Sequence, residues 1–359
     1  MKILTKNQGH LILNKNYIKW DLSHTTRSVV ITFADAYRDP ISCPSLEQAS
    51  KGQSIWGFDY IKKLELNVIS ISSLSEPSWY RENDLFHSLA TIEKDLSELK
   101  IFNRIGYAVS MGAFGASALS DILKIKKNIL FYPISTLDTK IAPFITGYKW
   151  ARDKFNWNTP HNDGANCKAE GIIIYDPLNK QDKLHQERYG GNYYRIRALC
   201  IGHGGASKII NTGLVKTYLS RAYSNSEVSI NELREIAKKR RYKQHYHDDM
   251  LAYKKQSFKR KFIIKYQKIK LIHNDIEIAR LLLNKEIDMA IKHSENLGGI
   301  DSHADVFRDY ALENEREIEV ALKCMSWANK IRPNGKFIKY KLDIYNLNIK
   351  KSHTKDCEI

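Results

Sequence analysis

The stretch Gly106-Tyr-Ala-Val-Ser-Met-Gly-Ala-Phe-Gly115 joins an apolar run to a run of small residues. Its centre, Ala108-Val-Ser110-Met-Gly112, follows the pattern G-x-S-x-G with Ala in place of the first Gly. Small residues flank the serine in this pattern because the backbone turns sharply there from a strand into a helix. The segment 113–123 that follows is rich in Ala, Gly and Ser, which allow a helix to lie close to a sheet. The stretch therefore predicts a sharp strand-to-helix turn that presents the Ser110 side chain.

The flanking sequence repeats this alternation of strand and helix. Continuous apolar and β-branched runs are typical of strands that are buried on both faces. They occur at 28–33, 67–72, 106–110, 128–132, 171–175 and 194–201. Helical patterns lie between them at 58–63 and 84–99. Strands that alternate with helices form crossover units, so we expect an α/β fold with a mainly parallel sheet.

The character of the chain changes after about residue 225. We expect an α/β domain over 1–225 and a basic helical region over 226–359, in which only the apolar run at 262–266 is ambiguous between strand and helix. The run 320–335 carries Ala321, Ala328 and Pro333, and it resembles the second helix of a tetratricopeptide repeat. Small residues at those positions let paired helices approach closely. We therefore expect an all-helical appendage.

An activated serine needs a base and an acid that follow it along the chain. In the strand-turn-helix arrangement described above, the acid follows a late strand and the histidine follows the last one. Asp176 ends the predicted strand 171–175, and Asp182 lies six residues later in what we expect to be a loop. Asp182 is the preferred acid and Asp176 the alternative. His203, flanked by glycines, is the candidate base, and His185 is in reserve.

Other positions are candidates for binding the substrate. The amide of Met111, at a helix N-terminus, would face a developing oxyanion. A second donor is expected after the first buried strand, from the amide of Phe33 or Ala34. The run Trp79-Tyr80-Arg81 follows a strand end and is a candidate sugar platform, and the segment 146–168 is a candidate lid.

These motifs, in this order, resemble the α/β-hydrolase superfamily over residues 29–214. The runs 107–112, 78–81 and 175–177 are similar to bacterial hydrolase-like proteins associated with surface polysaccharides. They are also loosely similar to the serine-hydrolase-like component of the accessory Sec glycoprotein system. The resemblance implies a Ser-His-acid site and acyl chemistry on sugars.

Composition limits the other classes of function. The 359 residues carry a net charge of +17, of which the segment 231–270 supplies +10. A basic run of this kind is usually a solvated helical face, and without a nucleic-acid-binding signature we disfavour nucleic acid as a partner. The sequence contains neither HExxH nor a phosphate-binding glycine loop, so we expect no metal and no cofactor. The five scattered cysteines and the lack of a signal-like or spanning segment lead us to expect a cytoplasmic protein.

Two interpretations remain. In the first, the chain is a serine hydrolase or acyltransferase that forms an acyl-enzyme on Ser110, with an ester of a small molecule or a glycan as substrate. In the second, it is a catalytically inactive scaffold that binds a partner protein or an anionic polymer through its basic helices. The reactivity of Ser110 distinguishes them.

Overall fold

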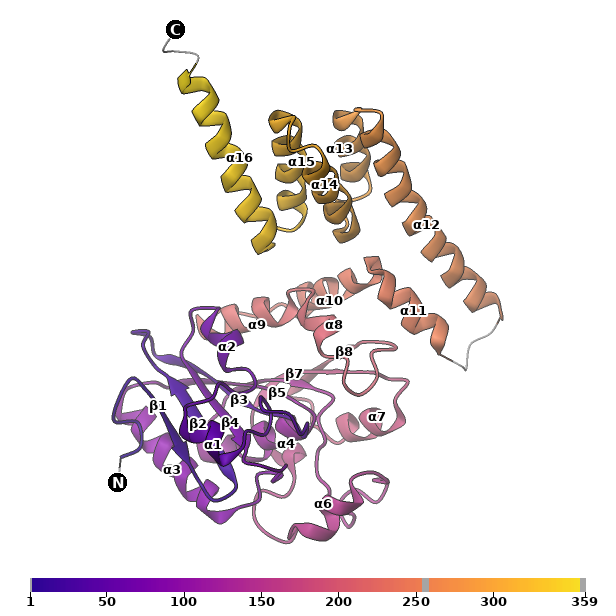
Figure 1. Cartoon of the computed structure of the whole chain (residues 1–359). Coiled ribbons are helices and arrows are strands. Elements are labelled where there is room, and N and C mark those ends of the chain that lie inside the picture. The colour runs from indigo at the N-terminus through magenta and orange to yellow at the C-terminus, as the bar shows by residue number, and fades with distance from the viewer. Residues whose placement is uncertain (1, 254–257, 356–359) are drawn as a thin grey trace. The chain divides into compact units, whose positions relative to one another are not determined.

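The computed structural model describes residues 2–253 and 258–355, and it divides into two compact units, Met1–Lys238 and Lys239–Ile359 (Figure 1). The first unit contains a single sheet of eight strands in the order β1-β2-β4-β3-β5-β6-β7-β8. The strands are β1 Gln8–Ile12, β2 Asn16–Asp21, β3 Ser28–Phe33, β4 Val68–Ser73, β5 Asn103–Val109, β6 Lys127–Phe131, β7 Glu170–Tyr175 and β8 Tyr193–Arg197.

Strand β2 runs antiparallel to both of its neighbours, and all the other neighbouring pairs are parallel. The sheet is mainly parallel, β3 lies between β4 and β5, and helices connect the parallel strands. This is the arrangement of the α/β-hydrolase fold. The predicted fold class is confirmed.

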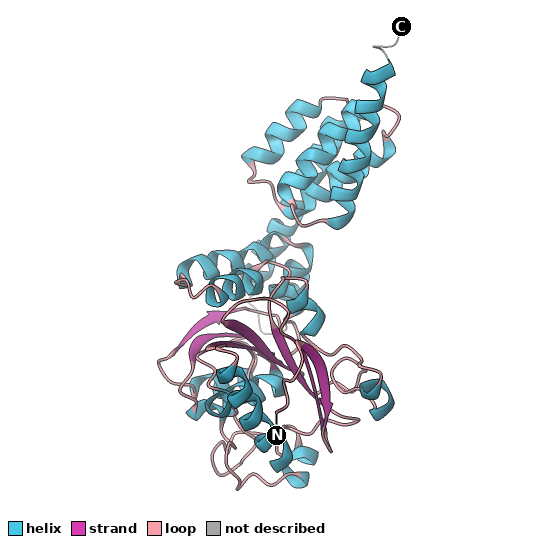
Figure 2. Cartoon of the chain, turned by 90° about the vertical axis from the view of Figure 1, so that its left-hand side faces the viewer, coloured by secondary structure: helices cyan, strands magenta, loops and turns pink. Residues whose placement is uncertain are grey.

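Helices cover both faces of the sheet, as Figure 2 shows. Successive side chains of a strand point to opposite faces, so each central strand supplies both cores. In β3, Val29 and Ile31 pack on the face that carries helices α3 (Asn83–Glu98) and α4 (Ser110–Ala118), whereas Val30 packs on the opposite face. The opposite face carries helices α2 (Phe58–Lys62), α9 (Leu214–Tyr223) and α10 (Ile230–Lys238). Burial on both faces explains why these strands are almost continuously apolar.

The first unit extends thirteen residues beyond the predicted boundary at 225. Helix α10 is amphipathic, and its Leu233 is fully buried in the same core as α9. The basic composition of the segment led us to assign it to the second region, but its apolar face covers the sheet of the first unit. The remaining short helices of the unit are α1 Leu46–Ser50, α5 Ser120–Leu123, α6 Lys149–Lys154, η1 Gly164–Asn166, α7 Lys180–Glu187 and α8 Ser207–Ile210.

The second unit is helical wherever the structure describes it. Its core includes the fully buried Ala304, Phe307, Ala321 and Ala328. The ambiguous run 262–266 lies within helix α12, and residues 254–257 of the basic segment lie outside the described ranges. The resemblance to a tetratricopeptide repeat stays a prediction. The elements are η2 Lys239–Tyr242, α11 Gln244–Ala252, α12 Phe258–Leu283, α13 Ile287–Asn296, α14 Asp301–Glu313, α15 Ile318–Ile331 and α16 Lys336–Lys355.

Over the described ranges, none of the helices has the length and apolarity that crossing a lipid bilayer requires.

Candidate active site

Ser110 occupies a strained turn between β5 and α4. Its φ is +50°, in the left-handed region that residues other than glycine rarely adopt. Gly112 allows this turn to lie against the end of β3, because a Cβ at that position would be only 2.1 Å from the carbonyl oxygen of Phe33. Ala108, which replaces the first glycine of the motif, lies fully buried in the core of the sheet and its methyl group is accommodated there. The departure from the motif therefore leaves the turn intact.

Ser110, His203 and Asp182 form one chain of hydrogen bonds. The Ser110 Oγ lies 2.7 Å from His203 Nε2, and His203 Nδ1 lies 2.6 Å from Asp182 Oδ1. The Asp182 side chain is 2% exposed and that of His203 is 27% exposed. A carboxylate accepts the Nδ1 proton, so Nε2 of the neutral ring is left to accept the proton of the serine.

Asp182 lies in the first turn of helix α7 rather than in the loop that we predicted. Asn179 caps this helix, its Oδ1 accepting the backbone N–H groups of Gln181 and Asp182 at 3.0 and 3.2 Å. Burial raises the pKa of Asp182, and the hydrogen bond from His203 opposes this rise.

Asp176, the alternative acid, binds backbone instead of the histidine ring. Its carboxylate accepts the N–H of Leu178 at 3.0 Å and the N–H of Gly202 at 2.9 Å. Gly202 has a φ of +63° and directly precedes His203. The structure therefore places Asp176 as an anchor for the loop that carries His203.

The predicted oxyanion donors differ in their surroundings. Met111 lies in the first turn of α4, where backbone N–H groups have no partner within the helix. The Ala34 N–H, in contrast, donates to the carbonyl of Ile71 at 2.9 Å, and Phe33 lies within strand β3, paired with Ala108 of β5. The prediction for Ala34 is corrected, because the sheet already uses its N–H.

The placement of Trp79 and Tyr80 as a sugar platform is also corrected. Both side chains are fully buried, and the Tyr80 hydroxyl donates to the carbonyl of Ala34 at 2.6 Å. Arg81, which is 7% exposed, donates to the carbonyl of Pro160 at 3.0 Å. The run 79–81 thus binds the loop after β3 through Tyr80 and the candidate lid through Arg81. Aromatic residues after a strand end do not reveal from sequence alone which way they point.

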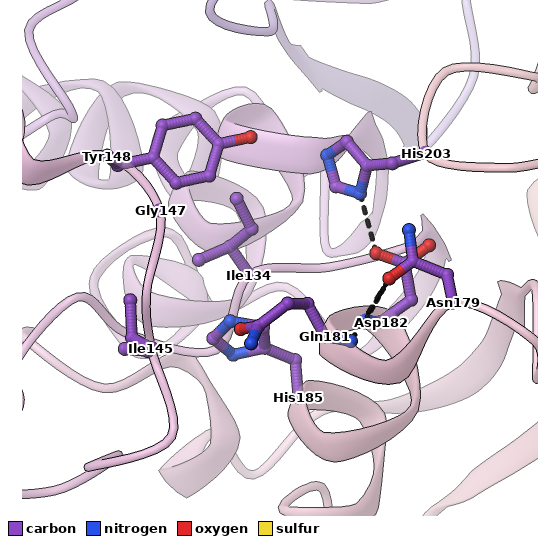
Figure 3. A pocket seen from close by; sticks show the side chains of 9 residues that line it. All are labelled: Ile134, Ile145, Gly147, Tyr148, Asn179, Gln181, Asp182, His185 and His203. Carbon is purple, nitrogen blue, oxygen red and sulfur yellow. Dashed lines mark hydrogen bonds and ion pairs between the residues drawn. The ribbon is translucent and has the colours of Figure 1, made fainter.

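A pocket of about 230 Å³ opens beside the hydrogen-bonded chain (Figure 3). It is lined by Ile134, Ile145, Gly147, Tyr148, Asn179, Gln181, Asp182, His185 and His203. Of these, sequence reasoning named Asp182, His185 and His203 individually, and it covered Gly147 and Tyr148 only as part of the candidate lid 146–168. The capping pattern Asn179-x-x-Asp182 was a signal that could have found Asn179.

Tyr148 is the residue whose absence from the individually named candidates matters most. Burial raises the pKa of Tyr148, and the nearby side chain of Ser110 opposes this rise. The Tyr148 ring packs edge-on against Trp79, with centroids 5.3 Å apart. The backbone of Tyr148 has a φ of +55°, which no local sequence pattern signals.

His185, the reserve base, does not face Ser110 through Nδ1. That nitrogen lies 3.2 Å from the N–H and 2.9 Å from the Oγ of Ser135. Burial, followed by the positive charge of Arg188, lowers the pKa of His185 to about 3. His185 is therefore a neutral residue in the lining of the pocket. Among the residues that the structure describes, no group of three or more His, Cys, Asp or Glu could hold a metal ion.

Comparison with known proteins adds structural likeness only. No protein-family profile matches the sequence, and no curated protein matches it. A glycosylation associate protein complex from Streptococcus agalactiae aligns with a TM-score of 0.40 and 16% identity, covering 62% of this chain and 48% of that chain. The chain thus spans about half the length of that relative.

Two enzymes align over more of their own length. They are carboxyl esterase 2 from the mycorrhizal fungus Tuber melanosporum (TM-score 0.36, 15% identity, 67% of this chain and 89% of that one) and the capsule O-acetyltransferase of Neisseria meningitidis serogroup A (TM-score 0.38, 16% identity, 61% and 96%). At these scores the likeness carries no conclusion about the reaction.

Proposed function

We propose that the first unit is a serine hydrolase or acyltransferase that forms an acyl-enzyme on Ser110. One observation carries the proposal: Ser110, His203 and Asp182 lie in a continuous chain of hydrogen bonds of 2.7 and 2.6 Å, beside a pocket that His203 and Asp182 line. A nucleophile within reach of a base, and a base oriented by an acid, is the arrangement that activates a hydroxyl. An inactive scaffold does not need these three side chains to lie within hydrogen-bonding distance of one another.

In the proposed reaction the Ser110 Oγ attacks an ester carbonyl carbon, and the hydroxyl proton moves to His203 Nε2. The backbone N–H of Met111 stabilises the negative charge on the carbonyl oxygen. The tetrahedral intermediate then breaks its bond to the alcohol, which leaves with the proton from His203. Water or a second alcohol then attacks the acyl-enzyme and gives its proton to His203. The bond between the acyl carbon and the Ser110 Oγ breaks, His203 returns the proton to Ser110, and the acid or the new ester leaves.

Asp182 holds the His203 ring in the tautomer that these steps need, and its negative charge stabilises the imidazolium that forms. Asp176 fixes the loop that carries the ring by accepting the N–H of Gly202. An acylated carbohydrate is the substrate class that we propose, with the helical second unit available for a protein partner. A reducing, cytoplasmic location is part of the proposal, supported by the thiols of Cys43, Cys167 and Cys324, which are not joined in disulfides in the described structure.

Labelling by a fluorophosphonate probe tests the proposal. We expect the wild-type chain to be labelled and Ser110→Ala to be unlabelled, with Ser207→Ala, which changes an exposed serine at the start of α8, labelled as strongly as wild type. His203→Ala should slow labelling strongly because the hydroxyl loses its base. Folded wild-type protein that takes up no label would refute the proposal and favour the scaffold interpretation.

A further inference from the structure

The lining of the pocket beside His203 and Asp182 combines aliphatic surface with neutral polar groups, which form what we call the wall. Ile134 and Ile145 supply the aliphatic part, and Asn179, Gln181 and His185 supply the polar part (Figure 3). The catalytic hydrogen-bond chain uses none of these five side chains, so their chemistry has to be explained separately.

The hydrogen bonds of His185 fix its tautomer. A backbone N–H can only donate, so Nδ1 must accept from the Ser135 N–H at 3.2 Å. The Arg188 guanidinium can also only donate, and it reaches the Ser135 Oγ at 2.7 Å, which leaves the Ser135 hydroxyl proton for His185 Nδ1 at 2.9 Å. Arg188 itself is held by the carboxylate of Asp163. The proton of the neutral ring therefore resides on Nε2.

The two amides of the wall are oriented by their own hydrogen bonds. Gln181 donates its Nε2 to the carbonyl of Phe144 at 3.0 Å, so its oxygen is left as an acceptor. The Asn179 Oδ1 accepts two helical N–H groups, so its amide nitrogen is left as a donor. Within the described ranges, no protein group pairs with the Asn179 nitrogen, the Gln181 oxygen or the His185 Nε2. The wall thus offers two donors and one acceptor.

The charge of the pocket selects among ligand classes. The lining contains no Lys or Arg, and its histidine at the catalytic chain, His203, is paired with the carboxylate of Asp182. The lining therefore offers no unpaired positive charge to bind a phosphate or a carboxylate. A purely aliphatic group would leave the buried His185 N–H without a partner, and sites built to hydrogen-bond a hydroxyl reject analogues that lack it. Hydroxyl groups both donate and accept, so they match this wall. The volume of about 230 Å³ is small for a ligand site and suits one ring.

We propose that the wall formed by Asn179, Gln181 and His185 binds the hydroxyl groups of a single uncharged sugar ring, with the His185 Nε2–H as its fixed donor. The proposal rests on the proposed function, since the acyl group of that sugar is the one that Ser110 would take. It assigns His185 to specificity: it contacts the ring of the substrate and not the ester that reacts.

Paired substrates test this assignment. We would compare the 6-O-acetyl methyl glycosides of glucose, galactose and mannose with cyclohexylmethyl acetate, which keeps the ester and a six-membered ring but lacks the hydroxyls. The wild-type chain should prefer at least one sugar ester by about 10-fold or more in kcat/KM. His185→Phe, which keeps a flat ring but removes the donor, should abolish that preference. His185→Gln, which restores an N–H, should recover part of it.

Controls separate this proposal from the proposed function. Ile145→Val alters the aliphatic wall and should change both classes of ester by the same factor. Fluorophosphonate labelling of each variant reports on the reactivity of Ser110 separately from its sugar preference. Binding of the unacetylated methyl glycosides and of cyclohexylmethanol to Ser110→Ala, with and without His185→Phe, is followed by ligand-observed NMR and needs no catalysis.

The outcomes are distinct. Normal labelling with no sugar preference, or with a preference that survives both His185 variants, would overturn the sugar wall and leave the serine chemistry standing. No labelling, together with glycoside binding that His185→Phe abolishes, would overturn the chemistry and support the wall. Absence of selective glycoside binding in that case would overturn both.

Discussion

Replacing Asp182 by asparagine tests which carboxylate orients His203. Asp182 Oδ1 accepts from the ring at 2.6 Å, whereas Oδ2 is buried and has no hydrogen-bond partner in the described structure. If the new amide turns its oxygen to His203, its NH₂ group is left buried without an acceptor, which costs about 1–3 kcal/mol. If it turns its NH₂ group to His203, Nδ1 must accept, and the ring proton moves to Nε2. In that tautomer the ring cannot take the proton of Ser110.

The expected loss follows from the tautomer. The corresponding change in a Ser-His-Asp site lowers kcat about 10⁴-fold, or about 5.4 kcal/mol of transition-state stabilisation. Asp176→Asn should do less. Its oxygen can still accept one of the two backbone N–H groups, and losing the other costs about 1–3 kcal/mol. We therefore expect Asp182→Asn to be about 100-fold less active than Asp176→Asn.

The assay is kcat/KM for p-nitrophenyl acetate, with circular dichroism to show that both variants fold. Fluorophosphonate labelling rates should follow the same order, because they depend on the same activated hydroxyl. Equal losses in the two variants, or a larger loss in Asp176→Asn, would refute the assignment of Asp182 as the acid.

Further substitutions test other parts of the structure. Gly112→Ala would place a methyl group 2.1 Å from a backbone carbonyl of β3, so urea denaturation should show that the free energy of unfolding falls by about 3 kcal/mol or more. Gly190→Ala is the control: nothing lies within 4 Å of the new methyl group, so its free energy of unfolding should stay within about 0.5 kcal/mol of that of wild type. Tyr148→Phe keeps the ring but removes the hydroxyl whose pKa the nearby Ser110 side chain lowers, so kcat should fall by about 10-fold with thermal stability unchanged; an unchanged kcat would show that the hydroxyl takes no part. Because burial lowers the pKa of His185 from 6.5 to about 3, the unfolded chain takes up a proton that the folded protein excludes; the resulting stability is present above pH 6.5 and is lost as the pH falls towards 3. His185→Gln should reduce the slope of unfolding free energy against pH in that range by about 1 kcal/mol per pH unit. Identical slopes in the variant and in wild type would contradict the lowered pKa of His185. Arg332→Met removes ion pairs between helices of the second unit that are about one-third exposed, so it should lower the stability of that unit by about 1–2 kcal/mol without changing esterase activity.

The strands of the sheet were predictable because each one depends on the pattern of residues that are adjacent in the chain. The run 28–33 is buried along its whole length, and only a strand covered on both faces needs an unbroken apolar sequence. The turn at Ser110 was predictable for a similar reason: the small residues on both sides of it are required by the backbone itself. The order of Ser110, Asp182 and His203 along the chain then suggested a site, although their catalytic roles stay predictions.

The environment of each side chain was not predictable in the same way. Trp79 and Tyr80 follow a strand end, where exposed and buried aromatics look alike in sequence, and only the packing of Phe114 and Trp157 against Trp79 decides that it is buried. The Ser110–His203 contact joins residues 93 positions apart. Contacts at that separation depend on the assembled sheet, so a single sequence carries little trace of them.

The position of Asp182 shows how a local signal and a distant one combine. A carboxylate that is 2% exposed is costly to keep ionised, and burial does raise its pKa. Two features oppose that cost: the hydrogen bond from His203, and the place of Asp182 in the first turn of α7, where the helix dipole favours negative charge. A loop, as we first predicted, would supply only the histidine. The cap at Asn179 starts the helix at the point that brings Asp182 into its first turn, so the cap contributes to the charge of the proposed acid as well as to the fold. The amide of Asn179 also belongs to the proposed sugar-binding wall, so Asn179→Ala should lower activity in two ways, of which the one through Asp182 changes the ionisation of the acid. A pH–rate profile would detect this as an altered apparent pKa of the His203–Asp182 pair, and a profile identical to wild type would show that the histidine alone keeps the acid ionised.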